Sequence, residues 1–140
     1  MTVLINREDF DAIVSHARAG LPNEACGLLA GKTEGDIRTV SRIYLLSNPD
    51  MSPEHFSIDP KEQLAAIKDM RAAGLMPLGN FHSHPSTPAR PSDEDIRLAY
   101  DRGASYLILS LAEQEPVLKA FAIADGAVTP QELNVTQSKK

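Results

Sequence analysis

The chain has 140 residues, of which 42% are hydrophobic, a length typical of a single domain that folds without disulfides or structural metals. Its formal net charge is −5, and no basic cluster precedes Lys139 and Lys140, which excludes the usual surface of a nucleic-acid-binding protein. The single cysteine, Cys26, excludes an intrachain disulfide and indicates a reducing compartment.

The first part of the chain predicts a strand, a helix and a hairpin. In chain order, the expected elements are a strand at 1–5, a helix at 7–19, strands at 24–31 and 37–46, and a short extended piece at 55–58. The helix should end at Gly20, and a turn at 33–36 should make the two longer strands antiparallel neighbours. The polar residues that follow the first strand leave no apolar stretch typical of a signal peptide.

The second part predicts two helices and four strands. In chain order, the expected elements are a helix at 60–73, a strand at 76–81, a helix at 92–101, and strands at 105–111, 117–124 and 128–135. Leu64, Ile67 and Met70 should face the core from the first of these helices. Because no apolar run approaches the roughly 20 residues of a membrane-spanning helix, we expect a soluble, cytoplasmic protein that does not interact with membranes.

Strands interleaved with about three helices predict one α/β (α+β) domain. We expect it to cover residues 1–135, with a mixed, mostly antiparallel sheet flanked by helices. Residues 136–140 are expected to form a flexible tail. No oligomeric state follows from the sequence.

A metal site is predicted where the strand at 76–81 ends. His82 and His84 come directly after it, and residues two apart in an extended chain point to the same side, so one cation can contact both imidazoles. Asp95 is the candidate third ligand. Two histidines and one carboxylate leave a fourth tetrahedral position open, as in catalytic rather than structural zinc sites.

Simpler interpretations of the same residues stay open. A pair of histidines at this spacing also arises by chance. Ser92 followed by an acid three residues later, Asp95, is an ordinary beginning of a helix. The two interpretations are compatible, because a helix capped by Ser92 would fix the direction in which Asp95 projects.

The complete pattern resembles the JAMM motif of MPN-domain metalloproteases. The motif residues are His82, His84 and Pro85, followed after a short loop by Ser92 and Asp95. The family also has an upstream glutamate before a strand of small residues, and Glu24, followed by Ala25-Cys26-Gly27, resembles it. The resemblance spans nearly the whole chain and implies a single MPN (JAMM) domain with a cytidine-deaminase-like fold.

The resemblance also implies a role for each motif residue. One Zn²⁺ per chain would be bound by His82, His84 and Asp95 and would activate the attacking water. Glu24 would accept the proton of this water and pass it to the leaving amine. Ser92 would donate a hydrogen bond to the developing oxyanion. Without the resemblance, Glu24 would be interpreted as a solvated residue at the start of a strand.

Members of this family cut peptide or isopeptide bonds after the Gly-Gly tail of ubiquitin-like proteins. The short link at residues 112–116 is similar to that of the compact prokaryotic members, which are associated with small sulfur carriers. The implied substrate is therefore an adduct or conjugate of a ubiquitin-like sulfur-carrier protein with a C-terminal Gly-Gly. Such a tail could add as a strand to an exposed sheet edge, for which residues 47–58 are the candidate.

Three other protein classes share part of this pattern, and each fits the sequence less well. A noncatalytic MPN scaffold would bind protein partners, but such members usually lack one or more of the ligands. RadC-like proteins share the histidine pair and the Ser and Asp of the motif, but usually have Asn where Ser83 stands. The zinc nucleobase deaminases need a Pro-Cys-x-x-Cys segment, which a chain with one cysteine lacks.

Four further residues carry expectations. Cys26 is expected to be a small buried residue beside Glu24, with a thiolate ligand or nucleophile as the alternative. His55 is expected to be solvated, although it could line the substrate groove. His16 is expected on a helix surface, and Asn80 stands where bulky apolar residues are common in the family.

Overall fold

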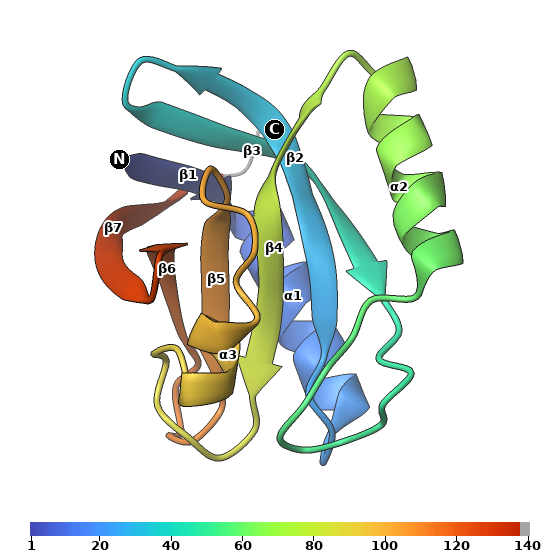
Figure 1. The fold of residues 1–140 in the computed structure, drawn as a ribbon, viewed down its shortest axis with the longest axis vertical. Coiled ribbons are helices and arrows are strands. Elements are labelled where there is room, and N and C mark those ends of the chain that lie inside the picture. The colour runs from blue at the N-terminus through green and yellow to red at the C-terminus, as the bar shows by residue number, and fades with distance from the viewer. Residues whose placement is uncertain (138–140) are drawn as a thin grey trace.

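The computed structural model describes residues 1–137 and contains seven strands and three helices (Figure 1). In chain order these are β1 (Thr2–Asn6), α1 (Arg7–Gly20), β2 (Cys26–Glu34), β3 (Ile37–Leu46), α2 (Pro60–Ala72), β4 (Met76–His84), α3 (Asp93–Arg97), β5 (Ser105–Ser110), β6 (Val117–Ala124) and β7 (Ala127–Thr136). The expected α+β domain is thus confirmed. Of the tail predicted at 136–140, Thr136 belongs to β7, and residues 138–140 lie outside the described part of the chain.

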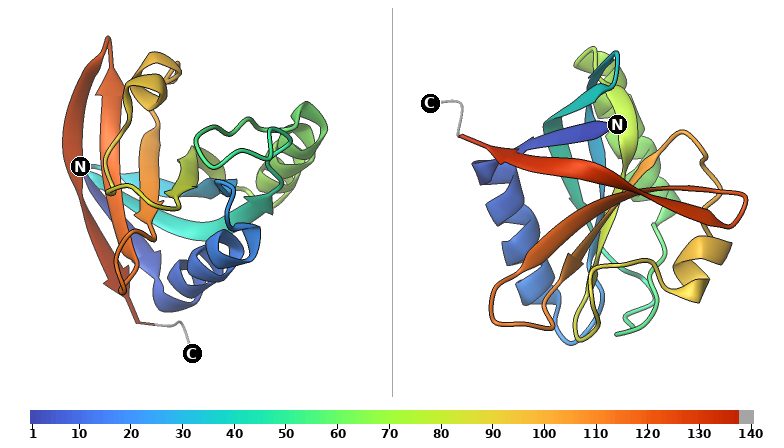
Figure 2. Two further views of the ribbon diagram at one scale, coloured as in Figure 1. Left: turned by 90° about the horizontal axis from the view of Figure 1, so that it is seen from below. Right: turned by 90° about the vertical axis from the view of Figure 1, so that its left-hand side faces the viewer.

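The strands pair in the order β1-β3-β2-β4-β5-β6-β7 and close into a barrel, because β1 also pairs with β7 (Figure 2). The pairs β1–β3, β1–β7 and β4–β5 are parallel, whereas the other four pairs are antiparallel. This confirms the expected mixed, mostly antiparallel sheet. The closure was not predicted, because it joins residues as distant in sequence as Thr2 and Glu132.

The two longer helices pack against opposite faces of the sheet. α1 begins at the cap residue Asn6, whose side chain accepts a hydrogen bond from the Asp9 backbone at 2.8 Å, and it buries Ile13 in the same cluster as Leu29 of β2. α2 covers the other face, where Leu28 packs. Because side chains alternate along a strand, Leu28 and Leu29 point to opposite sides. No helix among residues 1–137 is long and apolar enough to span a membrane.

The buried face of α2 differs from the expected one. Met70 is buried, as expected, and Ile67 is partly buried. Leu64, however, is 55% exposed, so its expected place in the core is wrong. The reason is that Ala66 and Met70 form the contact with the sheet, which turns Leu64 toward solvent.

The helix expected at 92–101 is much shorter than predicted, because α3 covers only Asp93–Arg97. Beyond its cap residue Leu98 the backbone is bound by a side chain of β5. The Tyr106 hydroxyl donates to the Asp101 carbonyl at 2.9 Å and accepts from the Asp101 amide at 3.1 Å. These bonds hold the chain in an irregular path alongside β4.

The edge strand expected within residues 47–58 is also wrong, because this loop forms neither strand nor helix. Side chains and a neighbouring backbone hold it instead. The Asn48 amide donates to the carbonyls of Glu24 at 3.0 Å and His55 at 2.8 Å, and the Glu24 amide donates to the Ser52 carbonyl at 2.8 Å. The loop therefore lies against the start of β2 without joining the sheet.

Candidate metal centre

The centre is built on β4, which lies between β2 and β5. His82 pairs with Cys26 of β2 and with Ile108 of β5, so its backbone is fixed from both sides. His82 and His84 are 3% and 4% exposed and point to the same face. Ser83 between them points the other way, and its hydroxyl accepts a hydrogen bond from the Ala25 amide at 2.8 Å. This bond ties the histidines to the residue that follows Glu24.

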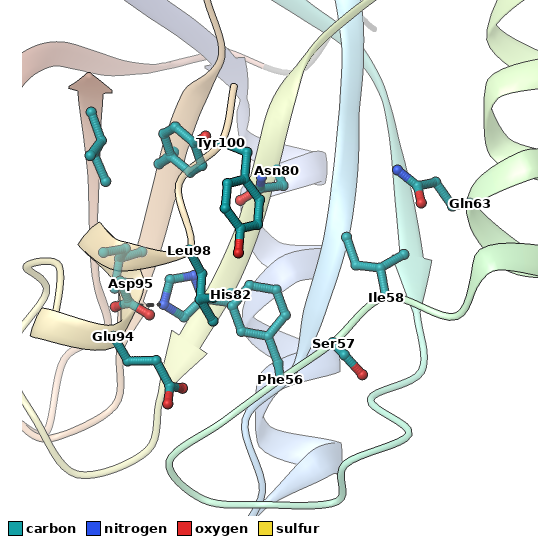
Figure 3. A pocket seen from close by; sticks show the side chains of 13 residues that line it. Phe56, Ser57, Ile58, Gln63, Asn80, His82, Glu94, Asp95, Leu98 and Tyr100 are labelled. Carbon is teal, nitrogen blue, oxygen red and sulfur yellow. Dashed lines mark hydrogen bonds and ion pairs between the residues drawn. The ribbon is translucent and has the colours of Figure 1, made fainter. Parts of the chain in front are cut away.

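The three predicted ligands converge on one point. The Nε2 atoms of His82 and His84 lie 3.1 Å apart, and Asp95 Oδ2 lies 3.2 Å and 3.1 Å from them. Figure 3 shows Asp95 of α3 beside His82 of β4. All three donor atoms fall within 4.8 Å of one another. Two imidazole nitrogens and a carboxylate oxygen at this separation can bind one divalent cation such as Zn²⁺, with a position left for water.

Each imidazole is oriented by a different contact. His84 Nδ1 donates to the Pro88 carbonyl at 2.9 Å, which orients the ring with Nε2 toward the centre. His82 Nδ1 is buried without a hydrogen-bond partner among residues 1–137. The ring of His82 is instead stacked on Phe56, with centroids 4.6 Å apart and planes 20° apart. This stacking was not predicted, because it joins the loop at 47–58 to β4.

Asp95 is positioned by the start of α3. The Ser92 hydroxyl accepts from the Asp95 amide at 3.1 Å, and Asp95 Oδ2 accepts from the Ser92 amide at 2.9 Å. The expected helix cap is therefore confirmed. Because the Ser92 oxygen is an acceptor in this cap, its hydroxyl proton stays available for donation to another group.

The charges of the centre favour cation binding. Burial lowers the pKa of His82, so that this imidazole is held neutral, as a metal ligand must be. Burial raises the pKa of Asp95, but the hydrogen bonds with His82 and His84 outweigh burial and hold that pKa well below its usual range. Asp95 is therefore an anion facing a neutral nitrogen.

Glu24 is buried immediately before β2, with 6% of its surface exposed. Its Oε1 atom has no hydrogen-bond partner among the described residues. Burial raises the pKa of this carboxyl to about 8, against the opposing effect of His84. A carboxyl with a pKa near neutrality can both accept and release a proton under physiological conditions.

The structure brings Glu24 and Ser92 to one cavity beside the histidine pair. The cavity has a volume of about 380 Å³ and is lined by Glu24, Pro53, Glu54, His84, Ser86, Thr87 and Ser92. All five predicted site residues are therefore gathered in one place, three as converging donor atoms and two on this cavity. We call it the Glu24 cavity.

A larger cavity is lined by His82 and Asp95 and shares no lining residue with the Glu24 cavity (Figure 3). Its volume is about 410 Å³, and its lining is mostly apolar, with Phe56, Ile58, Leu98 and Tyr100 among the walls. These four residues were not predicted to line a site, since they belong to irregular segments of the chain. Asn80 also lines it, and its position two residues before His82 on one strand could have indicated this.

The two other histidines, His16 and His55, also make specific contacts. His55 is half-exposed, in line with a solvated loop residue, and its Nδ1 lies 2.5 Å from Glu94 Oε1. This hydrogen bond raises the pKa of His55. His16 is not an ordinary surface residue as expected, because its Nε2 donates to the carbonyls of Leu46 at 2.8 Å and Cys26 at 3.2 Å.

Cys26 is buried, as expected. Its thiol lies 3.4 Å from the Ser47 carbonyl and 3.8 Å from the Ser57 carbonyl, so it contacts the loop from β2. Burial raises its pKa to about 12, which disfavours a thiolate ligand or nucleophile.

The chain is similar to known proteins over most of its length. The family described as prokaryotic homologs of the JAB domain matches residues 6–124. The CysO-cysteine peptidase of Mycobacterium tuberculosis is 39% identical over 137 residues, which cover 96% of this chain and 92% of that protein. The desampylase of Haloferax volcanii is 38% identical over 105 residues, or 71% of this chain and 74% of that protein.

A solved structure is similar over nearly the whole length. The solution structure of a protein from Desulfitobacterium hafniense has 55% sequence identity and a TM-score of 0.90, over 99% of this chain and 94% of that one. The two chains therefore share the same overall fold.

Proposed function

Because the chain belongs to the prokaryotic homologs of the JAB domain and is a JAMM-type peptidase, we propose that it cleaves the bond after the C-terminal Gly-Gly of a ubiquitin-like or sulfur-carrier protein. The leaving group would be an attached amino acid such as cysteine or a conjugated protein. The observation that carries the proposal is the convergence of His82, His84 and Asp95 next to a buried Glu24. The names of the relatives support the class of substrate.

His82, His84 and Asp95 would hold one Zn²⁺ per chain. Their donor atoms fit this ion, because two imidazoles and one anionic carboxylate supply nitrogen and oxygen ligands and leave one position open. When bound, zinc polarises a carbonyl and lowers the pKa of a water molecule to about 7. Glu24 Oε1, buried without a partner among residues 1–137, is a suitable acceptor for the proton of that water.

The residues of the chain would then divide the reaction between them. Glu24 accepts a proton from the attacking water and delivers it to the leaving amine, because it lines the cavity on that side and has a pKa of about 8. The Ser92 hydroxyl donates a hydrogen bond to the oxygen of the cleaved carbonyl, while its own oxygen keeps capping α3. Water enters through the Glu24 cavity.

A noncatalytic MPN scaffold is the alternative function. This alternative would be supported if protein purified without chelator contained no zinc. We expect close to one zinc ion per chain instead, and loss of activity on chelation that is restored by added zinc. Metal analysis of the purified protein therefore separates the two functions before any substrate is known.

The proposed reaction is tested with a diglycine-tailed carrier that bears either a C-terminal cysteine or a lysine-linked protein. The wild type with zinc should release the free diglycine end of at least one substrate. Glu24→Gln keeps the size of the side chain but cannot exchange the proton, so turnover should fall by about 100- to 10,000-fold. Cleavage that is equally fast in Glu24→Gln would overturn the assigned role, and no cleavage of either substrate would contradict the proposed reaction.

A further inference from the structure

The larger cavity beside His82 continues along β4 as a groove. A second cavity of about 580 Å³ adjoins it and reaches Pro77 and Gly103. The two cavities share their central lining, which consists of Ile58, Gln63, Asn80, Leu98, Tyr100 and Tyr106. Together they form one open path from the metal centre toward the beginning of β4, which we call the β4 groove. The segment after α3 lies on one side of it and the start of α2 on the other (Figure 3).

An unpaired amide lies at the floor of this groove. Asn80 pairs with Leu28 of β2 and Tyr106 of β5, so its side chain stands in a row between an apolar and an aromatic side chain. Its Oδ1 atom is buried, and no hydrogen-bond donor among residues 1–137 reaches it. The Tyr106 hydroxyl is not available, because it donates to Asp101. A buried acceptor without a donor is unfavourable and rare, which indicates that its partner comes from outside the chain.

The occupant of the β4 groove follows from the proposed function, on which this inference rests. Glu24 must lie beside the leaving amine in order to protonate it, and the Glu24 cavity shares no lining residue with the β4 groove. The amine side of the substrate therefore occupies the Glu24 cavity, and the acyl side extends into the β4 groove. A flexible tail ending in glycine suits this groove because the groove runs along β4 to His82, where Phe56 stacks on the ring.

We propose that Asn80 is a positioning residue that accepts a hydrogen bond from a backbone N–H of the substrate tail. Asn80 and His82 are two residues apart on one face of β4, a separation of about 6.6 Å along the strand. In an extended tail, the amide nitrogen of the penultimate residue lies about 6 Å before the cleaved carbonyl carbon. The penultimate N–H is therefore the donor whose spacing matches Asn80.

This contact would fix the register of the tail. A tail displaced by one residue would present a carbonyl oxygen to Asn80 Oδ1 in place of an N–H, because the two groups alternate along an extended backbone. The hydrogen bond to Asn80 Oδ1 would therefore favour the register that places the bond after the last glycine at the metal centre. A bulky apolar residue at position 80 could fill the groove but could not set this register.

The test uses a fluorogenic peptide with the tail sequence ending in Gly-Gly-aminomethylcoumarin, and an analogue in which an ester oxygen replaces the penultimate N–H. The wild type should cleave the ester analogue with a kcat/KM about five- to tenfold lower, the size expected for one lost hydrogen bond. Asn80→Ala should cleave the amide peptide about five- to tenfold more slowly than the wild type and should treat both peptides alike. Gln63→Ala, which alters another amide of the groove, should keep the wild-type preference.

The outcomes separate the two proposals. Equal kcat/KM for the two peptides in the wild type, or an unchanged preference in Asn80→Ala, overturns the role of Asn80 while leaving the proposed reaction intact. If the wild type cleaves neither peptide nor a carrier adduct, both proposals are overturned. Zinc content and thermal unfolding of Asn80→Ala are measured alongside; if that variant does not fold, Asn80→Ser takes its place and must show the same loss of preference.

Discussion

The two sides of the metal centre are built in different ways. On one side, β4 and the first turn of α3 carry the ligands, and their backbones are fixed by strand pairing and by the Ser92 cap. On the other side, residues 47–58 form no regular element and are held by single side chains such as Asn48. A metal centre needs ligand positions fixed to a fraction of an ångström. A segment that covers the substrate can instead be one whose local opening requires less free energy than the opening of a paired strand.

The largest expected effect comes from removing a ligand on the rigid side. His84→Ala deletes one of the three donor atoms and the hydrogen bond to the Pro88 carbonyl. We expect loss of bound zinc and of measurable turnover, because a two-residue site no longer defines a tetrahedral centre. Metal analysis and a cleavage assay measure both. Full zinc content in His84→Ala would show that the cation is held elsewhere.

Ser92→Ala separates the two roles of Ser92, which are to cap α3 and to donate a hydrogen bond to the oxyanion. If Ser92 also serves as an oxyanion donor, turnover should fall by about 100- to 1000-fold. Loss of its cap should cost only about 1 kcal/mol of folding free energy. Chemical denaturation and kcat report the two effects independently. A stability loss of this size with normal kcat would reduce Ser92 to a cap.

The same contrast explains what the sequence could predict. His82 and His84 are local in sequence, and so is the cap that presents Asp95, so spacing alone brought these residues together. Glu24 has no such local signal, and only the resemblance to a family selected it. The irregular side was predicted wrongly, as an edge strand at 47–58 and a long helix at 92–101.

The errors have a common physical cause. The path of residues 98–104 depends on hydrogen bonds between Tyr106 and Asp101, and the loop at 47–58 depends on Asn48 bonding the backbone of Glu24. Closure of the barrel likewise depends on β1 pairing with β7. Each of these contacts joins two separate segments of the chain. The local pattern of hydrophobic residues, from which the elements were predicted, contains no information about such contacts.

Asn48→Ala tests whether the irregular side acts on the substrate rather than on the metal. The variant loses the hydrogen bonds to the Glu24 and His55 carbonyls, so the loop should open more often. We expect about a tenfold loss in kcat/KM, equivalent to roughly 1.4 kcal/mol, with an unchanged zinc content. Zinc lost together with activity would mean that the loop and β4 form one cooperative unit.

The smallest effect on turnover is expected at Cys26, where the two sides meet. Its thiol contacts the Ser47 and Ser57 carbonyls of the loop, and burial raises its pKa from the ordinary value of 9.0 to about 12. Cys26→Ala should leave turnover unchanged, because the thiol takes no part in the reaction. In the wild type, alkylation at pH 8 should be about 1000-fold slower than in the unfolded chain, since few thiolates form in the folded protein.

The direction of the pH effect follows from the raised pKa. The folded state binds the thiol proton more tightly than the unfolded state, so the stability contributed by the neutral thiol is present below pH 9.0 and is lost as the pH rises toward 12. Cys26→Ala should remove this loss, which denaturation at pH 8 and pH 10 would show. Faster alkylation in Asn48→Ala than in the wild type would measure opening of the loop directly, because the loop covers the thiol. Equal alkylation rates in both proteins would mean that this loop is as rigid as β4, and the contrast between the two sides would not hold.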